Sequence, residues 1–456
     1  MGFYIKTILK KIVRQWEYPS LLFPRGNATV FPEYSESKLR IAARLRSIKS
    51  DLRHRKVTYN LGALYTLPHP FAIRACRTFL GQNPNHLGNW SLKSAQKSAA
   101  TQQLEYEAIA KMIDLYHGKL NQLEGYLTSG GTEGNLFLAW TGRKYLEKRV
   151  KKERICLLRT DLTHYSVRKA ADIIGVSDFI IPLSPRNWNI DAEGLENTIN
   201  KLYRRGFKGF LLPLTLGYTL TGTCDNINLV VSVVQAVQRK RPDCVFFLWI
   251  DAALSGLIIP FLNSEFSPFF NKMIQGLVVD YHKFGLVPYP GGVVIYRRNL
   301  RHLIEKTIDY LPEKDNTVSG SRSGISAVAI WSMMHYFGSQ GYKKLVKKCL
   351  ANKRYFCSLV NEKLPGVKII TDPQSLTCGL VFKSAITLKN IVQKYGLYPT
   401  KKTFLFLPEK KEYVIYKLYF LPHLRRKIID EFINDLMKYN QNQRSKSYEK
   451  PRASSC

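Results

Sequence analysis

A glycine-rich turn occupies residues 129–136, where the sequence reads SGGTEGNL. Gly130 and Gly131 would let backbone N–H groups approach an anion, and Thr132 adds a hydroxyl. The residues that follow have helical spacing, so the turn would open a helix whose dipole favours negative charge. The turn alone is weak evidence for a phosphate cradle, and it gains weight only from the residues around it.

Three other residues have types and positions that could do chemistry together with this turn. His164 falls in a predicted strand-to-helix loop, where a lone histidine is more often structural than functional. Asp251 ends the apolar run FFLWI, and a buried carboxylate there needs a cationic partner: an arginine, a metal or a protonated heterocycle. Lys283 follows another short apolar run, where desolvation can remove its proton and allow Schiff-base chemistry. A phosphate cradle, a ring-stacking histidine, a carboxylate and a strand-end lysine together suit pyridoxal 5'-phosphate.

The elements that must position these residues alternate between apolar runs and amphipathic helical segments. Continuous apolar strands separated by such helices predict an α/β fold with a mostly parallel sheet covered on both faces. Ligands of such sheets lie beyond the carboxyl ends of the strands. The expected strands are 155–158, 179–183, 209–216, 245–250 and 276–280, and the expected helices between them include 99–116, 166–174 and 229–239.

The composition divides the chain into four segments. We expect a basic N-terminal arm over 1–60, a large cofactor-binding domain over 61–325, a smaller α+β domain over 326–440 and a polar, disordered tail over 441–456. The small domain would begin with a long helix, continue with strands near 367–371, 379–382 and 413–420, and end with a helix over 424–439.

The chain of 456 residues carries 69 Lys and Arg against 34 Asp and Glu, a net charge of +35. Anionic partners are therefore favoured, but the charge is spread along the chain and no aromatic residues are interleaved with it. We expect no specific nucleic-acid partner. The alternating apolar and basic residues 1–16 could make weak contact with an anionic membrane, although an arm packed on a partner subunit is the commoner case.

The eight cysteines contain no CxxC pair, and no secretory signal opens the chain, so a cytoplasmic setting is expected. A cysteine-based zinc site is not expected, and no metal is required. The one long apolar run, residues 244–262, is interrupted by Asp251, whose charge argues against a membrane span.

The sequence resembles the group II pyridoxal-phosphate-dependent amino acid decarboxylases of fold type I over roughly residues 60–440. The resemblance rests on SGGTEGNL, on HYSVRKAA from His164, on DAALSGLIIPF from Asp251, on HKFG from His282 and on DNTVSGSRSG from Asp315. The run that ends in SGSRSG is most similar to the histidine and serine decarboxylases. The sequence around Lys283 is more similar to that of bacterial tyrosine decarboxylases and sphingosine-phosphate lyases.

The resemblance implies a role for each matching residue. Lys283 would form the internal aldimine, Asp251 would keep the pyridine nitrogen protonated, and His164 would stack on the ring. Tyr310, in the region of the family's mobile loop, is suggested as proton donor, although it could equally be an ordinary surface tyrosine. The phosphate would be surrounded by Gly130, Gly131, Thr132 and His282, with Thr219 near the ring oxygen.

Two positions depart from the pattern. Asp280 stands where the histidine and serine branch has a serine, and its charge would repel a phosphate. Lys417 stands where many members have an arginine for the substrate carboxylate, and it can supply charge but no bidentate contact. Arg322 could bind a carboxylate or a neighbouring subunit's phosphate region, or be an ordinary loop arginine.

The leading hypothesis is decarboxylation of an L-amino acid to its amine and CO₂ in a homodimer. The resemblance alone suggests a small or polar substrate such as histidine or serine. One alternative is a carbon–carbon lyase similar to sphingosine-phosphate lyase, which Asp280 and the basic surface favour. Another is a non-catalytic protein of the same fold that binds anionic partners.

Overall fold

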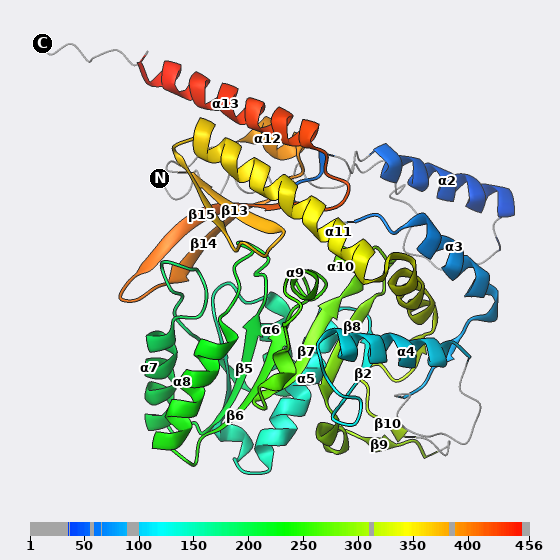
Figure 1. Ribbon diagram of the computed structural model, residues 1–456, viewed down its shortest axis with the longest axis vertical. Helices are drawn as coiled ribbons and strands as arrows, with labels where there is room; N and C mark the ends of the chain where they lie inside the picture. Colours follow the sequence, from blue (N-terminus) through cyan, green and yellow to red (C-terminus); the bar gives the residue numbers. More distant parts are fainter. Residues whose placement is uncertain are drawn as a thin grey trace, which may run out of the picture. The chain divides into compact units, whose positions relative to one another are not determined.

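The computed structural model describes residues 35, 37–54, 59–64, 66–88, 100–309, 314–382 and 388–448. Residues 1–56 and 57–456 form two separate compact units. The first contributes helix α2 (Lys38–His54), and the second contains all the other elements (Figure 1). The basic residues 1–16 and Tyr310 lie outside the described residues.

The centre of the larger unit is a seven-stranded sheet in the order β2-β8-β7-β6-β5-β3-β4. Every neighbouring pair is parallel except those of β8, which runs antiparallel to both β2 and β7. The predicted mostly parallel α/β sheet is therefore confirmed. The strands are β2 (Leu123–Thr128), β3 (Ile155–Arg159), β4 (Ser177–Ile180), β5 (Gly209–Thr215), β6 (Val245–Asp251), β7 (Ile274–Asp280) and β8 (Gly292–Arg297).

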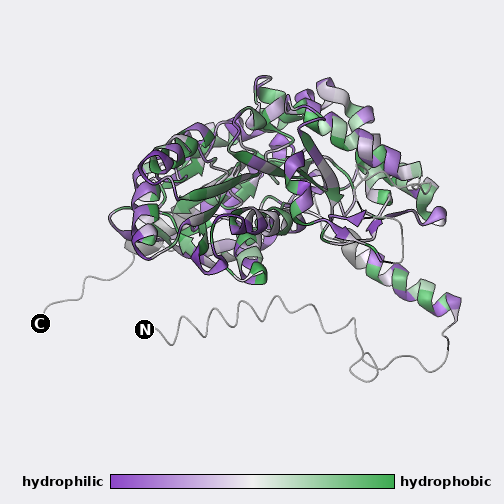
Figure 2. Ribbon diagram, turned by 90° about the horizontal axis from the view of Figure 1, so that it is seen from below, coloured by the Kyte–Doolittle hydropathy of each residue, from purple (hydrophilic) through white to green (hydrophobic). Residues whose placement is uncertain are grey.

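Strand β6 shows why its sequence is apolar throughout. Phe246, Leu248 and Ile250 pack into the core on one face of the sheet, whereas Phe247 and Trp249 pack into the core on the other. A strand with helices on both sides has no polar face, so its apolar run is continuous. Figure 2 shows hydrophobic residues along these central strands.

The helices of the larger unit cover both faces of the sheet. Residues of α5 (Gly131–Glu147) and α6 (Tyr165–Ile174) belong to one core, and residues of α4 (Ala100–Leu115), α7 (Ala192–Arg204) and α8 (Ile227–Lys240) belong to the other. Shorter helices are α3 (Pro70–Phe79), α9 (Ile259–Leu262) and α10 (Tyr281–Phe284).

Side chains at the helix starts fix where several of these helices begin. Asp191 accepts from Gly194 N at 2.7 Å before α7, and Asn226 accepts from Leu229 N at 3.0 Å before α8. His164 caps α6 by accepting from Ser166 N at 3.4 Å, and Gly175 ends that helix with φ 65°. Such caps satisfy backbone groups that the helix itself leaves unpaired.

The C-terminal part contains a four-stranded antiparallel sheet in the order β12-β13-β15-β14. It follows α11 (Ile325–Lys363), which kinks at Gly338 where φ is 56°. One hydrophobic core of this C-terminal part is formed by residues of α11, of α12 (Lys389–Lys394) and of α13 (Arg426–Tyr448) packed with residues of the sheet. The strands are β12 (Val367–Thr371), β13 (Thr377–Phe382), β14 (Pro399–Leu405) and β15 (Lys410–Tyr419). The fold class predicted for this part is confirmed, and the exact boundaries 60/61 and 325/326 stay predictions.

The expected disordered tail is wrong for its first residues, because α13 continues to Tyr448. Neither glycine nor proline interrupts the run from Asn440 to Tyr448, so nothing in it stops the helix. Two-residue ladders complete the structure, pairing β1 (Asn85–His86) with β11 (Arg322–Ser323) and β9 (Lys306–Thr307) with β10 (Lys314–Asp315).

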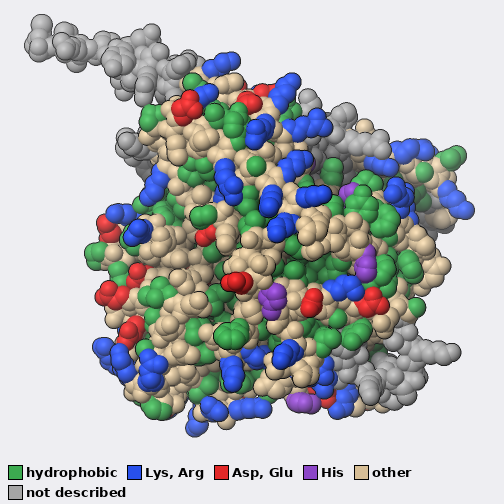
Figure 3. All heavy atoms as spheres, viewed as in Figure 1, with side chains coloured by type: hydrophobic (Ala, Val, Ile, Leu, Met, Phe, Trp, Pro, Cys, Tyr) green, Lys and Arg blue, Asp and Glu red, His purple; other side chains and the backbone are tan. Residues whose placement is uncertain are grey.

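The described surface agrees with a generally basic composition. On the face shown in Figure 3, Lys and Arg side chains are spread over the molecule rather than gathered in one patch. Among the described helices, none is long and apolar enough to cross a membrane.

Candidate active site

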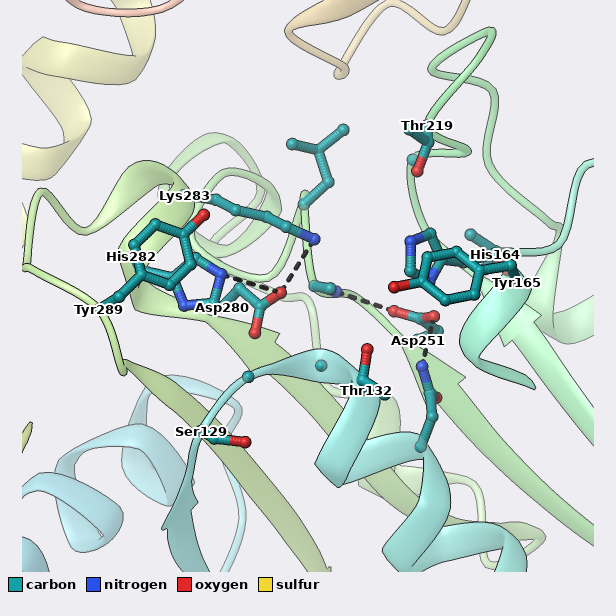
Figure 4. A pocket seen from close by; sticks show the side chains of 17 residues that line it. Ser129, Thr132, His164, Tyr165, Thr219, Asp251, Asp280, His282, Lys283 and Tyr289 are labelled. Atoms are coloured by element: carbon teal, nitrogen blue, oxygen red, sulfur yellow. Dashed lines mark hydrogen bonds and ion pairs between the residues drawn. The ribbon is translucent and has the colours of Figure 1, made fainter. Parts of the chain in front are cut away.

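A cavity of about 400 Å³ lies where the carboxyl ends of β5, β6 and β7 meet the first residues of α5 and α6. Figure 4 shows Lys283, Asp251 and His164 directed toward this common space. Every residue that the sequence suggested for cofactor binding lines the cavity: Gly130, Gly131, Thr132, His164, Thr219, Asp251, His282 and Lys283.

The glycine turn forms one wall, and its close packing explains why side chains are absent there. A Cβ atom on Gly130 would lie 3.0 Å from His282 Cε1, and one on Gly131 would lie 3.1 Å from Asp280 Oδ2. The turn is held from behind because Ser129 N donates to Glu133 Oε2 at 2.8 Å. The first N–H groups of α5 therefore border the cavity at a helix N-terminus, an arrangement that favours an anion.

Asp251 is buried at the end of β6, where a side-chain amide and a backbone N–H hold its carboxylate. Asn135 Nδ2 donates to Asp251 Oδ2 at 2.8 Å, while Asn135 Oδ1 accepts from Trp249 Nε1 at 2.9 Å. The tryptophan N–H fixes which end of the amide faces the carboxylate. The other carboxylate oxygen accepts from Ala253 N at 3.2 Å. The carboxylate is thus oriented by two donors, the Asn135 amide and the Ala253 N–H.

The same amide reaches His164. Asn135 Nδ2 lies 3.1 Å from Ser166 Oγ, which lies 2.8 Å from His164 Nδ1. Burial lowers the pKa of His164 below its ordinary value, although the charge of Asp251 acts in the opposite direction. A neutral imidazole suits stacking on a ring.

Lys283 lies in α10 and makes an ion pair with Asp280, whose Oδ2 is 2.9 Å from Lys283 Nζ. Burial opposes the charged ammonium, but the adjacent Asp280 carboxylate outweighs burial and raises the pKa of Lys283 above its ordinary value. Desolvation, which by itself favours loss of the proton, is therefore offset by Asp280. Thr66 Oγ1 donates to the Lys283 carbonyl at 2.8 Å and secures the backbone of α10.

His282 lies between the glycine turn and an exposed tyrosine. Its ring stacks on Tyr289 with 4.0 Å between centroids, and its Nε2 lies 3.6 Å from Asp280 Oδ2. Burial lowers the pKa of His282, against the charge of Asp280. Two buried atoms at this end, His282 Nδ1 and Asp280 Oδ1, have no hydrogen-bond partner among the described residues.

These residues fit pyridoxal phosphate in most respects. The glycine turn and His282 form a cradle of the right chemistry for a phosphate, with a buried imidazole nitrogen that lacks a partner in the described chain. Asp251 could meet a protonated pyridine nitrogen, and Lys283 could bind an aldehyde. Asp280 is the one residue whose charge opposes a phosphate at the turn.

Arg322 does not line the cavity. Its guanidinium is paired with the buried Glu105, donates to Leu127 O at 3.0 Å and to Gly88 O at 2.6 Å, and lies 5.0 Å from the Tyr126 ring centre. It binds a carboxylate, but that carboxylate belongs to this chain. The structure thus gives Arg322 a role in packing.

Lys417 also lies outside the cavity lining. It is half-buried on β15 opposite Gly379, with its ammonium 6.0 Å from the Tyr398 ring centre. Burial lowers the pKa of Lys417, and its charge contributes to lowering the pKa of His164. The charge of Lys417 therefore acts on a residue that lines the cavity.

Sequence reasoning missed several lining residues. Asn135 follows Gly131 by four residues in α5, so helical spacing alone places both on one side of the helix. Tyr165 and Tyr289 lie beside two quoted motifs but carried no signal of their own. The other unpredicted lining residues are Ser129, Thr215, Gly217, Ala253 and Leu254.

Comparison with known proteins decides the family. Residues 88–384 match the pyridoxal-dependent decarboxylase conserved domain. The chain belongs to this family. A pyridoxal-dependent decarboxylase is a carboxy-lyase, and its cofactor is pyridoxal phosphate.

Decarboxylases named for different amino acids are similar to this chain. The chain is 28% identical to a tryptophan decarboxylase of Clostridium sporogenes, covering 80% of this chain and 85% of that protein. It is also 28% identical to a histidine decarboxylase of Vibrio anguillarum, covering 65% of this chain and 73% of that protein. The fold matches an L-methionine decarboxylase of Streptomyces sp. 590 with a TM-score of 0.76, 18% identity and coverage of 90% and 96% of the two chains.

Proposed function

We propose that this decarboxylase removes the carboxylate carbon of an L-amino acid as CO₂ and releases the corresponding amine, with its cofactor bound through Lys283. The convergence of Lys283, His164 and an amide-oriented Asp251 on one cavity carries this proposal. A protein that had kept only the fold would not need these three side chains to face one another.

Each residue of the cavity has a task in this proposal. Asp251 would hold a proton on the pyridine nitrogen, and His164 would cover one face of the ring. Lys283 would bind the aldehyde. When bound, pyridoxal phosphate supplies a protonated ring that accepts the electron pair left by departing CO₂. The phosphate end would be held by Gly130, Gly131, Thr132 and His282, with Thr219 near the ring oxygen.

The group that orients the substrate carboxylate decides which bond breaks, because the breaking bond must stand perpendicular to the ring. We assign this task to Lys417, which is half-buried and close enough for its charge to act on His164. Tyr310 stays a prediction as proton donor. The homodimer also stays a prediction, which light scattering of the purified protein tests.

The proposal is tested by incubating purified protein and pyridoxal phosphate with each of the twenty amino acids and measuring CO₂ and amine together. We expect one or a few amino acids to yield both products in equal amounts, and Lys283→Ala to yield neither. Lys353→Ala, which removes a buried lysine outside the cavity, serves as the control.

Absence of CO₂ from every amino acid would contradict the proposal. Release of an aldehyde from a phosphorylated amino alcohol, without CO₂, would instead support the carbon–carbon lyase.

A further inference from the structure

The charge of Asp280 does not suit the phosphate cradle formed by the glycine turn and His282. Its side chain is 3% exposed, and its Oδ2 lies 3.1 Å from the position that a Cβ on Gly131 would take. A carboxylate so close to the turn would repel a bound phosphate. The residue can be tolerated there only if its charge is compensated or lost.

In the structure the compensation comes from Lys283. The ammonium Nζ lies 2.9 Å from Oδ2, while Oδ1 is buried without a hydrogen-bond partner in the described chain. Removing either charge alone would leave the other buried and unpaired, which is costly. The ion pair therefore stabilises the charged form of Lys283.

Lys283 cannot keep this ammonium if it is to bind an aldehyde, because only the free amine has the required lone pair. We propose that Asp280 is the counter-ion that keeps Lys283 charged and so limits how readily this lysine captures the cofactor. The inference rests on the proposed function, which assigns the attachment to Lys283.

Other charges around Lys283 are less directly placed. Asp251 on β6 and the Tyr289 hydroxyl also raise the pKa of Lys283 through their charges, but each does so less than Asp280. Burial lowers the pKa of both His164 and His282, so they add little positive charge. Lys417 on β15 lies outside the cavity lining and lowers the pKa of His164 through its charge. Asp280 is therefore the main partner of the ammonium.

The test measures Lys283 itself in cofactor-free protein. Wild type, Asp280→Asn and Asp251→Asn are labelled with acetic anhydride from about pH 6 to about pH 10, and the peptide that carries Lys283 is quantified by mass spectrometry. Asp251→Asn is the matched control because it removes another buried carboxylate from the same cavity. Thermal melting checks that each variant is folded.

We expect Asp280→Asn to lower the apparent pKa of Lys283 and to speed its labelling near neutral pH by about tenfold or more, since loss of an opposite charge this close shifts a pKa by about one unit or more. Asp251→Asn should change the labelling less. An unchanged pH profile in Asp280→Asn, or an equal change in Asp251→Asn, would overturn the inference.

A second arm separates this inference from the proposed function. Wild type is mixed with pyridoxal phosphate and reduced with borohydride, and the modified lysine is mapped. Attachment at Lys283 with an unchanged labelling profile removes only the role of Asp280. Attachment at a different lysine removes the proposed function, and the role of Asp280 falls with it.

Discussion

Asn135 Nδ2 donates to Asp251 Oδ2 at 2.8 Å, so a residue of helix α5 orients a carboxylate at the end of strand β6. The same amide accepts from Trp249 and donates to Ser166, which contacts His164. One side chain thus links the two residues that would hold opposite parts of the cofactor ring.

Replacing Asn135 should weaken cofactor binding. In Asn135→Ala, Asp251 and Trp249 Nε1 both lose a buried partner, which costs about 1–3 kcal/mol and therefore about tenfold or more in cofactor affinity. A titration of cofactor absorbance measures this affinity. Asn352→Ala is the control, because Asn352 is also buried and donates to Leu424 O at 2.9 Å, but far along the chain from the cavity. Equal loss of affinity in both variants would argue against an orienting role.

A methyl group at the glycine turn should have a local effect. In Gly131→Ala the new Cβ would lie 3.1 Å from Asp280 Oδ2 and 3.2 Å from Ala253 Cβ, so the turn must shift. We expect the cofactor dissociation constant to rise about tenfold, from a strain of about 1–3 kcal/mol. Gly366→Ala meets nothing within 4 Å and should leave the constant unchanged. Unaltered binding in Gly131→Ala would show that the turn does not contact the cofactor.

His164 should contribute through its ring rather than through charge. Because burial lowers its pKa below the ordinary 6.5, the imidazole is neutral at neutral pH. His164→Ala should therefore reduce cofactor affinity several-fold, the magnitude of about 0.5–1.5 kcal/mol typical of ring contacts, and His164→Phe should restore part of it. If His164→Phe were no better than His164→Ala, stacking would not be the role of this residue.

The Glu105–Arg322 pair should make stability depend on acid pH. Burial alone would raise the pKa of Glu105, but Arg322 and His86 outweigh it and lower the pKa to about 2 from 4.5. The stability from ionised Glu105 is then fully present above pH 4.5 and is lost as pH falls toward 2. The difference in pKa corresponds to about 3 kcal/mol.

Glu105→Gln tests this linkage by urea unfolding at several pH values. The variant should be less stable than wild type at neutral pH, and the difference between them should shrink as the pH falls below 4.5. A constant difference across this range would show that Glu105 does not titrate in the folded protein as described.

The sequence predicted the parallel part of the sheet because those strands are apolar on both faces, as β5 and β6 are. It did not predict β2, whose run LEGYLT contains a glutamate and a glycine. Glu124 is fully buried there and lies 3.5 Å from Arg301, a pairing across 177 residues that no local pattern reveals.

The candidate site was predictable to the extent that its chemistry lies in short motifs. Lys283, Asp251, His164 and the glycine turn were found this way, and the fold brings them together. The interpretation of Arg322 needed the structure, because its partner Glu105 is distant in sequence. The pairing of Lys283 with Asp280 depends on the geometry of α10, although the two are only three residues apart.

The most direct test of the account is the visible absorbance of the purified protein with pyridoxal phosphate, measured for wild type and for Lys283→Ala. The account predicts a protein-bound band in wild type that borohydride abolishes, and no such band in the variant. A band of equal strength in Lys283→Ala would contradict the central claim, because the cofactor would then be held by another residue.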